Sequence, residues 1–464
     1  MTGESVPSLW RNRDFVVFMS AQTLSSVGDS ISYVALPLLV LHVTGSVVQM
    51  GVVTALAGAA STVTGIFAGV VTDRVDRRAL LLVCDVARCL LYAVIPLAWW
   101  ISPQTWVLYV VVPLAGVFSM LFQVAYVAVV PRLVAPGQIT KANGHLYGTY
   151  AVASVGGPML AGVLSGLWGP AAAIAIDAGS FALSALGISL LRLRPAASPD
   201  AASADAQDAD AAPGGAPGSS PGAAPGAAPG ASPGAAPGAS PGGEGARREG
   251  EGVSGRRAAL REFAAGARFL WAHPVLRSLT VLLSMLTFLT FGLPDILVYY
   301  LKHDLGQPDG SVGYVLAFAT VGTLAAAVVV APARRRLGFG LCWIGAYATA
   351  GVAVAVLGLA TGVPVVAALA TILLFCTGVA GICSMSLRQE VTPDRLLGRV
   401  TSAFWTLHSA LGPVGAALLT AGAARYGVTA TCLVIGIACL LIAMAGLLTP
   451  IRRPHPETLA GEAA

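Results

Sequence analysis

Long apolar segments separated by short polar turns recur through this 464-residue chain, and they constrain its fold more than any other feature. About 20 apolar residues in a helix are enough to cross the roughly 30 Å hydrocarbon core of a bilayer. Hydrophobic residues make up 56% of the chain and charged residues only 11%, whereas soluble domains carry about 25% charged residues. The sequence therefore predicts an all-α polytopic membrane protein.

We expect twelve membrane-spanning helices in two sets of six. The predicted ranges are 15–42, 47–71, 79–100, 105–130, 142–166, 170–191, 276–301, 311–333, 340–361, 364–387, 400–424 and 428–449. Seven cysteines all fall within these apolar spans, without a CxxC pair, and we interpret them as packing residues rather than metal ligands.

Basic residues fall on one side of this pattern. If the N-terminus is cytoplasmic, the outer loops hold only Lys302 and Arg425, and the remaining basic residues of the loops are on the inner side. The inner set includes Arg11, Arg13, Arg74, Arg77, Arg78, Arg132, Lys141, Arg334 to Arg336, Arg388, Arg395, Arg399, Arg452 and Arg453. The positive-inside rule then predicts that both termini are cytoplasmic. The net charge of +5 reflects this orientation and does not indicate nucleic-acid binding.

A low-complexity segment separates the two sets of spans. From Pro213 to Pro241 a Pro-Gly pair returns every four residues, and such a segment buries too little apolar surface to fold. It is either a plain tether or a regulatory element. The predicted divisions are an N-terminal six-helix bundle, a disordered cytoplasmic linker, an amphipathic cytoplasmic helix, a C-terminal six-helix bundle and a cytoplasmic tail, at 1–194, 195–255, 256–275, 276–450 and 451–464.

The two sets of spans echo each other in sequence. The fifth contains VGGPMLAG and the eleventh contains SALGPVGAA, and each follows an inner segment of related pattern, VVPRLVAPG or VTPDRLLGR. The turn TDRVDRR after the second span corresponds to ARRRLG after the eighth. Two parallel six-span repeats joined by a long inner loop are expected.

The turn after the second span also carries a family resemblance. GVVTDRVDRRALL resembles the signature that transporters of the major facilitator superfamily have between their second and third helices. The matching residues are Gly69, Asp73, Arg74, Arg77 and Arg78, and Asp76 stands where many members have glycine. That superfamily has the two-repeat plan expected above.

Two further stretches support the resemblance. The fifth span is similar to the family's antiporter signature, with alanine at two of its glycine positions and matches at Gly144, Gly157, Pro158 and Gly162. The opening LWRNRDFVVFMSAQTLSSVGDSISYVALPLLVLHVTGS resembles the branch of macrolide-efflux and enterobactin-exporter-like proteins. The resemblance implies a monomeric transporter of the bacterial plasma membrane, without metal or cofactor. It would use alternating access to export a small hydrophobic or amphipathic compound (a drug, antibiotic or siderophore-like molecule) in exchange for protons.

In that family the turn after the second span latches the halves together on the inner side. Asp73 lies at the C-terminal end of its helix, where the helix dipole disfavours an anion, so we expect a partner elsewhere. That partner is either the start of the eleventh span near Arg399 or the side chain of Arg132. Alternatively, Arg77 and Arg78 belong to a solvated cluster that only orients the chain.

Charged residues inside the spans are candidates for function, because a carboxylate at the bilayer centre costs about 2.5–3.5 kcal/mol on insertion scales. Asp29 lies roughly 24 Å along the first span from Arg13, at 1.5 Å per residue. It shares one helical face with Gln22, Ser26 and Tyr33. Asp29 either binds a proton or cationic substrate, or forms structural hydrogen bonds with neighbouring helices.

The other intramembrane groups have two interpretations each. Asp85 and Arg88 are spaced to pair with one another, as a structural pair or a transport element. Asp177 and Asp295 form an outer gate or cap helix interfaces, and His408 is a proton relay or a packing residue. Several polar or aromatic side chains either line a cavity or pack between helices: Gln123, Tyr126, Tyr147, Tyr150 and Trp405.

Two other function classes compete with transport. An intramembrane enzyme would need catalytic motifs, but Asp73-x-x-Asp76 has no second acidic cluster and the chain has no HExxH. A non-transporting receptor would sense its ligand without moving it. An ATP-driven pump is excluded because the chain lacks a GxxxxGK[ST] sequence.

We predict that deleting residues 200–245 leaves transport and membrane insertion nearly unchanged, because Pro-Gly repeats make no buried contacts. The measurement is export by cells that express the shortened chain, normalised to its amount in the membrane. Loss of insertion or export would show that the segment is structural or regulatory.

Overall fold

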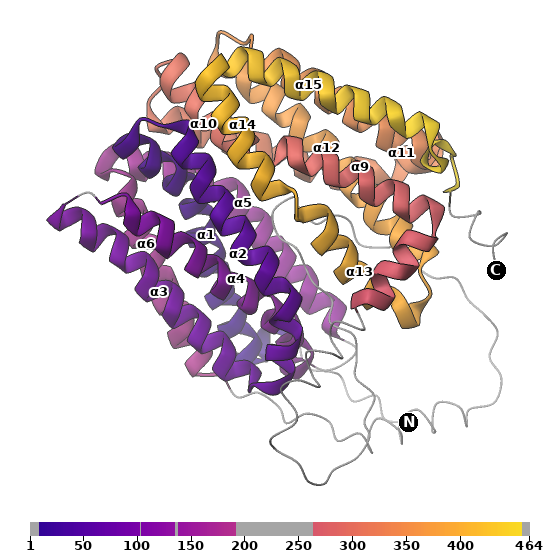
Figure 1. Cartoon of the computed structure of the whole chain (residues 1–464). Helices are drawn as coiled ribbons and strands as arrows, with labels where there is room; N and C mark the ends of the chain where they lie inside the picture. The colour runs from indigo at the N-terminus through magenta and orange to yellow at the C-terminus, as the bar shows by residue number, and fades with distance from the viewer. Residues whose placement is uncertain (1–8, 103, 135–137, 192–262, 457–464) are drawn as a thin grey trace, which may run out of the picture.

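The computed structural model describes residues 9–102, 104–134, 138–191 and 263–456. Within these ranges the chain forms helices and turns and no strand (Figure 1). Eleven helical segments are long and apolar enough to cross a membrane. The predicted all-α membrane fold is confirmed, whereas the proposed linker at 195–255 lies outside the described residues.

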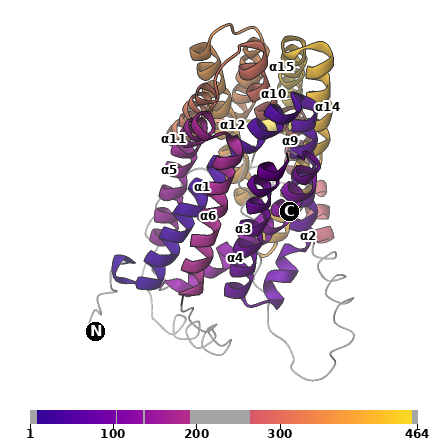
Figure 2. The same cartoon turned by 90° about the vertical axis from the view of Figure 1, so that its left-hand side faces the viewer.

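Six long helices form the N-terminal half, after a short 3₁₀ turn at Leu9–Arg11. They are α1 (Arg13–Thr44), α2 (Val47–Arg74), α3 (Arg77–Ile101), α4 (Trp106–Leu133), α5 (Ile139–Trp168) and α6 (Pro170–Ser189). α1 packs between α5 and α6, while α3 packs on α4 and α6 (Figure 2).

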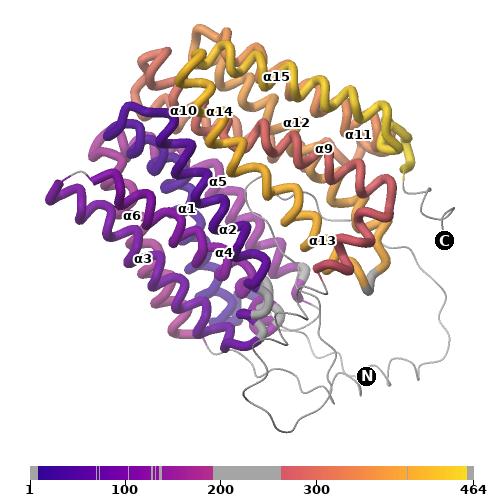
Figure 3. The backbone as a smooth tube through the Cα atoms, in the orientation of Figure 1, coloured from indigo at the N-terminus to yellow at the C-terminus, as the bar shows by residue number. Residues whose placement is uncertain are grey.

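The C-terminal half contains α9 (Pro274–Thr290), α10 (Leu293–Tyr299), a π-helical turn η3 (Tyr300–Asp304), α11 (Asp309–Leu357), α12 (Val363–Val391), α13 (Asp394–Ser409), α14 (Gly412–Tyr426) and α15 (Val428–Ala445), followed by 3₁₀ turns at Gly446–Leu448 and Pro450–Arg452. Residues 263–272, which precede α9, are also helical. A Cβ added to Gly266 of that helix would meet the backbone of Arg399 near the start of α13. The backbone trace separates the two halves by colour (Figure 3).

α11 is a hairpin of two spans. At 49 residues it would be about 74 Å long if straight, more than twice the bilayer core. Gly338 interrupts it with φ +75°, a left-handed conformation that glycine adopts without strain. Both ends of α11 lie near one turn, because Lys302 donates to Asp309 at 2.6 Å and Tyr300 donates to the Ala360 carbonyl at 2.7 Å. With this hairpin the described chain makes the twelve predicted crossings.

Two spans of the C-terminal half are broken by proline. The seventh span stops at Thr290 and restarts at Leu293 beside Pro294, and the eleventh stops at Ser409 and restarts at Gly412 beside Pro413. Proline lacks a backbone N–H and its ring clashes with the preceding helical turn. α5 instead continues through Pro158, so the two related sequences have different helix geometry.

The turn between α2 and α3 is fixed by local caps. Asp76, at the position where the signature usually has glycine, is the N-cap of α3 and accepts a hydrogen bond from the Ala79 amide at 2.9 Å. Arg78 donates to the carbonyls of Ile188 and Ser189 at the end of α6. Arg78 therefore neutralises a helix C-terminus within its own half.

We call the end of the molecule where α2, α4, α6 and α12 finish the linker end, and the opposite end the far end. The halves contact each other along α5 with α11 and along α2 with α14. His42 of α1 lies 3.3 Å from Asp309 of α11 at the far end. Figure 1 shows the halves close together around α10 and α14 and further apart toward α13. The molecule is thus closed at the far end.

Small residues make this closure possible. A Cβ on Gly162 would lie 2.9 Å from the Asp309 carbonyl oxygen and from the Gly313 Cα, both backbone atoms of the other half. Gly157, which precedes Pro158, instead meets Ser30 of α1 within its own half. Of these two signature glycines, Gly162 therefore lies at the interface between halves, where close backbone approach is favourable in membranes.

We predict that Gly162→Leu opens the far end, because the added side chain would meet backbone atoms of α11 and overpacking costs about 1–3 kcal/mol. Spin labels at Gln104 and Thr361, on far-end loops of the two halves, should move apart. Gly166→Leu is the matched control, because a Cβ there has no neighbour within 4 Å. An unchanged label distance in Gly162→Leu would contradict a tight α5–α11 contact.

Candidate functional site

The first helix has two chemically distinct faces near its middle. Asp29 and Tyr33 are exposed, with 49% of the Asp29 side chain and 57% of Tyr33 accessible. At about 100° per residue, Asp29 lies about 180° around the helix from Ser20. Tyr33 is close enough to Asp295 of α10 and Tyr150 of α5 to interact electrostatically with both. The Asp29 face of α1 is therefore directed toward the opposite half.

Arg88 of α3 links Asp29 to the interior of the N-terminal half. Its guanidinium donates to the adjacent carboxylate of Asp85, and its Nη1 lies 3.7 Å from Asp29 Oδ2. Phe122 and Phe181 cover the guanidinium, with ring centroids 4.4 and 4.2 Å from Cζ. Arg88 and Asp85 are 2% and 0% exposed. The sequence-predicted pair is thus buried, and its arginine also reaches Asp29.

Asp177 of α6 belongs to the same region. Its carboxylate accepts hydrogen bonds from Ser32 of α1 and from Ser180, the latter at 3.0 Å. Asp177 is completely buried within the N-terminal half. A Cβ added to Gly28 would strike Asp177 and Ser180, so glycine at this position lets α1 approach α6.

We call Asp29, Asp85, Arg88 and Asp177 the N-half charge cluster. It contains three carboxyl groups and one guanidinium group, so it has an excess of two negative charges when all are ionised. Unpaired charge in a low-dielectric interior is costly. Proton binding is the simplest way for such a cluster to reduce its excess charge, and Asp29 is the half-exposed member.

Two candidates lie in the C-terminal half. Asp295 is buried at the start of α10, with Thr54 of α2 within hydrogen-bonding reach, so it lies at the contact between halves. His408 is buried in α13, where its ring stacks 4.9 Å from Phe404 and its Nδ1 contacts the Phe404 carbonyl oxygen at 3.1 Å. The structure does not bring His408 together with the N-half charge cluster.

The structure describes the side chains of three signature residues of the α2–α3 turn. Arg74 is exposed, Arg77 begins α3, and Arg78 caps α6. Gly69 lies within α2, whereas the side chain of Asp73 lies outside what the structure describes, so the predicted latch stays a prediction.

The remaining sequence candidates in the N-terminal half lie on α1, α4 and α5. Gln22 is buried, and its amide nitrogen has no hydrogen-bond partner among the described residues. Tyr126 stacks 5.5 Å from Phe18, which makes it a packing residue. Tyr147 is 55% exposed and Gln123 is exposed. Gly144 lines a cavity of ≈ 340 Å³ between α1 and α5.

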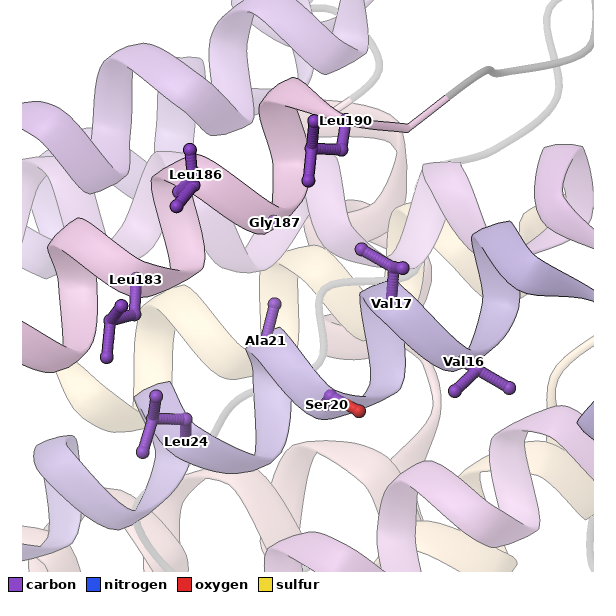
Figure 4. Close-up of a pocket in the computed structure, with 9 residues that line it drawn as sticks. All are labelled: Val16, Val17, Ser20, Ala21, Leu24, Leu183, Leu186, Gly187 and Leu190. Carbon is purple, nitrogen blue, oxygen red and sulfur yellow. The ribbon is translucent and has the colours of Figure 1, made fainter.

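A second groove of ≈ 350 Å³ runs between α1 and α6. Figure 4 shows its nine lining residues, of which Ser20 alone has a hydroxyl group. The other lining residues are apolar or glycine, and Leu24 and Leu186 are examples. The groove is on the α1 face opposite Asp29 and contains no titratable side chain, so it is distinct from the charge cluster.

Sequence reasoning misplaces one buried cation. The sequence predicts Arg388 in an inner loop, but it lies in the last turn of α12 and is 2% exposed. Its Cζ is 3.8 Å from the centroid of the Phe404 ring. The apolar run GICSMSL immediately before Arg388 could have indicated this position, because it continues the tenth span to this residue.

Known transport proteins resemble this chain in sequence and in fold. The chain is 24% identical over 424 residues to the multidrug efflux pump Tap of Mycolicibacterium fortuitum, covering 90% of this chain and 91% of the relative. It is 22% identical over 185 residues to macrolide efflux protein A of Streptococcus pyogenes, covering 40% and 45%. The crystal structure of the nucleoside transporter NupG has the same fold, with a TM-score of 0.67, 11% identity and coverage of 94% and 98%.

The family assignment rests on a match that is independent of these individual proteins. The model of the Major Facilitator Superfamily matches residues 18–413, from the first span to the break in the eleventh. The matched range includes the first ten spans, the start of the eleventh and the whole N-half charge cluster. The chain is a multi-pass membrane transporter, not an enzyme, and it belongs to the Major Facilitator Superfamily.

Proposed function

We propose that this transporter exports a small hydrophobic or amphipathic compound in exchange for protons, by alternating access between the two halves. Both relatives described above are named as efflux proteins, which supports the direction of transport. A bacterial plasma membrane is the proposed location, with the linker end and both termini in the cytoplasm and a monomer as the working unit. The arginine-rich turns at the linker end support this orientation.

One observation carries the coupling proposal: Arg88 has two carboxylate neighbours in different environments. Asp85 is fully buried, whereas the side chain of Asp29 is 49% accessible and lies on the α1 face directed toward the other half. Asp29 is therefore the carboxyl group that exchanges protons with water between the halves. Asp85 keeps Arg88 paired when Asp29 is protonated.

This arrangement couples proton binding to the charge seen by a substrate. With Asp29 ionised, the face between the halves presents a carboxylate that attracts a cationic or polar group. With Asp29 protonated, the same face is neutral and Arg88 is held by Asp85 alone. Because the halves meet at the far end through Gly162 and the His42–Asp309 contact, the proposed export cycle requires these contacts to open while the linker end closes.

The latch assigned to the α2–α3 turn belongs to this cycle as a proposal. Closing the linker end would bring Asp73 and Arg74 toward α13, which diverges from α2 in Figure 1. Substrate movement into inverted vesicles tests the proposal, because proton-coupled export predicts accumulation that is lost when the proton gradient is removed.

We predict that Asp29→Asn binds substrate but fails to concentrate it, because a permanently neutral side chain cannot alternate its charge. Exchange of substrate without a proton gradient should persist. The measurement compares uphill uptake with gradient-free exchange in inverted vesicles. Asp29→Glu should keep part of the uphill transport with a shifted pH dependence.

Asp304→Asn is the control for Asp29→Asn, because Asp304 is a carboxylate of the η3 turn paired with His303 at 2.8 Å. It should leave coupling unchanged. Wild-type uphill transport by Asp29→Asn would remove Asp29 from the coupling step and leave it a structural acceptor.

We predict that Arg88→Gln destabilises the protein by about 3–5 kcal/mol, because it leaves the buried carboxylate of Asp85 without its cation. Arg88→Gln combined with Asp85→Asn should recover much of this loss, since both charges are then absent. Thermal unfolding of the purified protein measures stability, and vesicle uptake measures coupling. Recovery of uphill transport together with stability would show that Arg88 acts only as a structural partner.

A further inference from the structure

The C-terminal half buries an arginine beside aromatic rings, and no carboxylate accompanies it among the described residues. The Cζ atom of Arg388 lies 3.8 Å from the Phe404 ring centroid and 5.5 Å from that of Trp405, and its Nη2 contacts Met385 Sδ at 3.4 Å. These neighbours are all uncharged. Among the side chains that the structure describes, none forms an ion pair with Arg388.

Arg88 and Arg388 are both buried, but they differ in their counter-charges. Both guanidinium groups are 2% exposed and stack on aromatic rings. Arg88 has Asp85 and Asp29 as counter-charges, while Arg388 has none within the described residues. A buried cation without an anion is strongly unfavourable. The described residues of the tenth and eleventh spans therefore leave the positive charge of Arg388 without a counter-charge.

The unsatisfied groups at this position are all hydrogen-bond donors. Arg388 Nε, Arg388 Nη1 and Trp405 Nε1 are buried and have no acceptor in the part of the chain that the structure describes. Guanidinium and indole N–H groups can donate but cannot accept, and buried polar groups are nearly always paired. The complementary ligand group is an anionic oxygen acceptor, and the planar guanidinium fork matches a carboxylate or a phosphate.

The position of the site limits where such a ligand comes from. Phe404 and Trp405 lie about 15–17 Å along α13 from its start at Asp394, at 1.5 Å per residue. Arg388 reaches them from the last turn of α12, since helical side chains lean toward the N-terminus of their helix. The donors are therefore in the linker-end part of the C-terminal half, within reach of that side of the membrane.

We propose that Arg388 and Trp405 form a binding site for an anionic oxygen group, a carboxylate or a phosphate. Two sources supply this chemistry: the headgroup of an anionic lipid, and the acidic group of a soluble molecule such as a transported compound. The site is separate from the N-half charge cluster. Its occupation does not depend on proton-coupled export.

The test measures thermal unfolding of the purified full chain in neutral detergent at constant ionic strength. The probes are phosphatidylglycerol, phosphatidylcholine with the same acyl chains, benzoate and inorganic phosphate. We expect at least one anionic probe to raise the unfolding temperature of the wild type while phosphatidylcholine does not. A response to phosphatidylglycerol alone assigns the site to lipid, and a response to benzoate or phosphate assigns it to a soluble acid.

Arg388→Gln should need about tenfold more of the effective probe, because a charge-assisted hydrogen bond is lost. Arg335→Gln is the matched control, an exposed arginine at the same end of the molecule, and it should respond as the wild type does. Trp405→Phe keeps the ring but removes the indole N–H, so it should weaken the response without removing the stacking.

The unfolding temperature of Arg388→Gln in the absence of any probe is a second measurement, and the proposal predicts the direction in which it changes. Without an anionic probe, Arg388→Gln should unfold at the same temperature as the wild type or higher, because it removes an uncompensated buried charge. A lower unfolding temperature combined with an unchanged anion response would make Arg388 a packing residue and overturn the proposal. A wild type that responds to none of the anionic probes would overturn it as well.

Discussion

The pairing of Arg88 with Asp85 is the interaction on which the N-terminal half depends. Both groups are removed from water by three surrounding helices and two phenylalanine rings. Either charge alone would destabilise the half, because a single buried charge in this environment has no solvent to stabilise it. Because their charges balance one another, the half can hold two further carboxyl groups, Asp29 and Asp177, close to the same guanidinium. The pair thus makes an acidic and partly exposed site compatible with a membrane interior.

The two halves use buried arginine differently despite their related sequences. In the N-terminal half the cation is balanced by carboxylates from α1 and α3. In the C-terminal half it faces two aromatic rings and a thioether. The repeat therefore supplies a common helical framework, while the distribution of acidic residues gives each half its own electrostatic character. This asymmetry is what the proposed proton coupling in one half and the proposed anion site in the other would require.

Hydropathy and residue spacing predicted the features that depend on local sequence. Twelve spans follow from apolar length, and the Asp85–Arg88 contact follows from its i,i+3 spacing. The approach of Asp29 to Arg88, and of Ser32 to Asp177, depends on how α1 packs against α3 and α6, which a linear pattern does not contain. The same holds for Gly157 and Gly162, since only the packed structure separates a contact inside one half from a contact between halves. Arg388 was misplaced because one residue at the end of an apolar run has the same composition signal whether it is buried or in a loop.

The hairpin turn at Gly338 has a consequence for the order in which the protein is assembled. The amides of Phe339 and Gly340 donate to the carbonyls of Pro454 and Arg453, at 2.8 and 3.3 Å. These acceptors are synthesised after the turn that needs them, with the ninth to twelfth spans in between. The eighth and ninth spans can insert early, but the two amides of their connection stay unpaired until residues 453 and 454 have been made. The N-terminal half has no such dependence on these residues among its described contacts, so it is able to mature during synthesis, whereas the C-terminal half is completed only when these residues arrive.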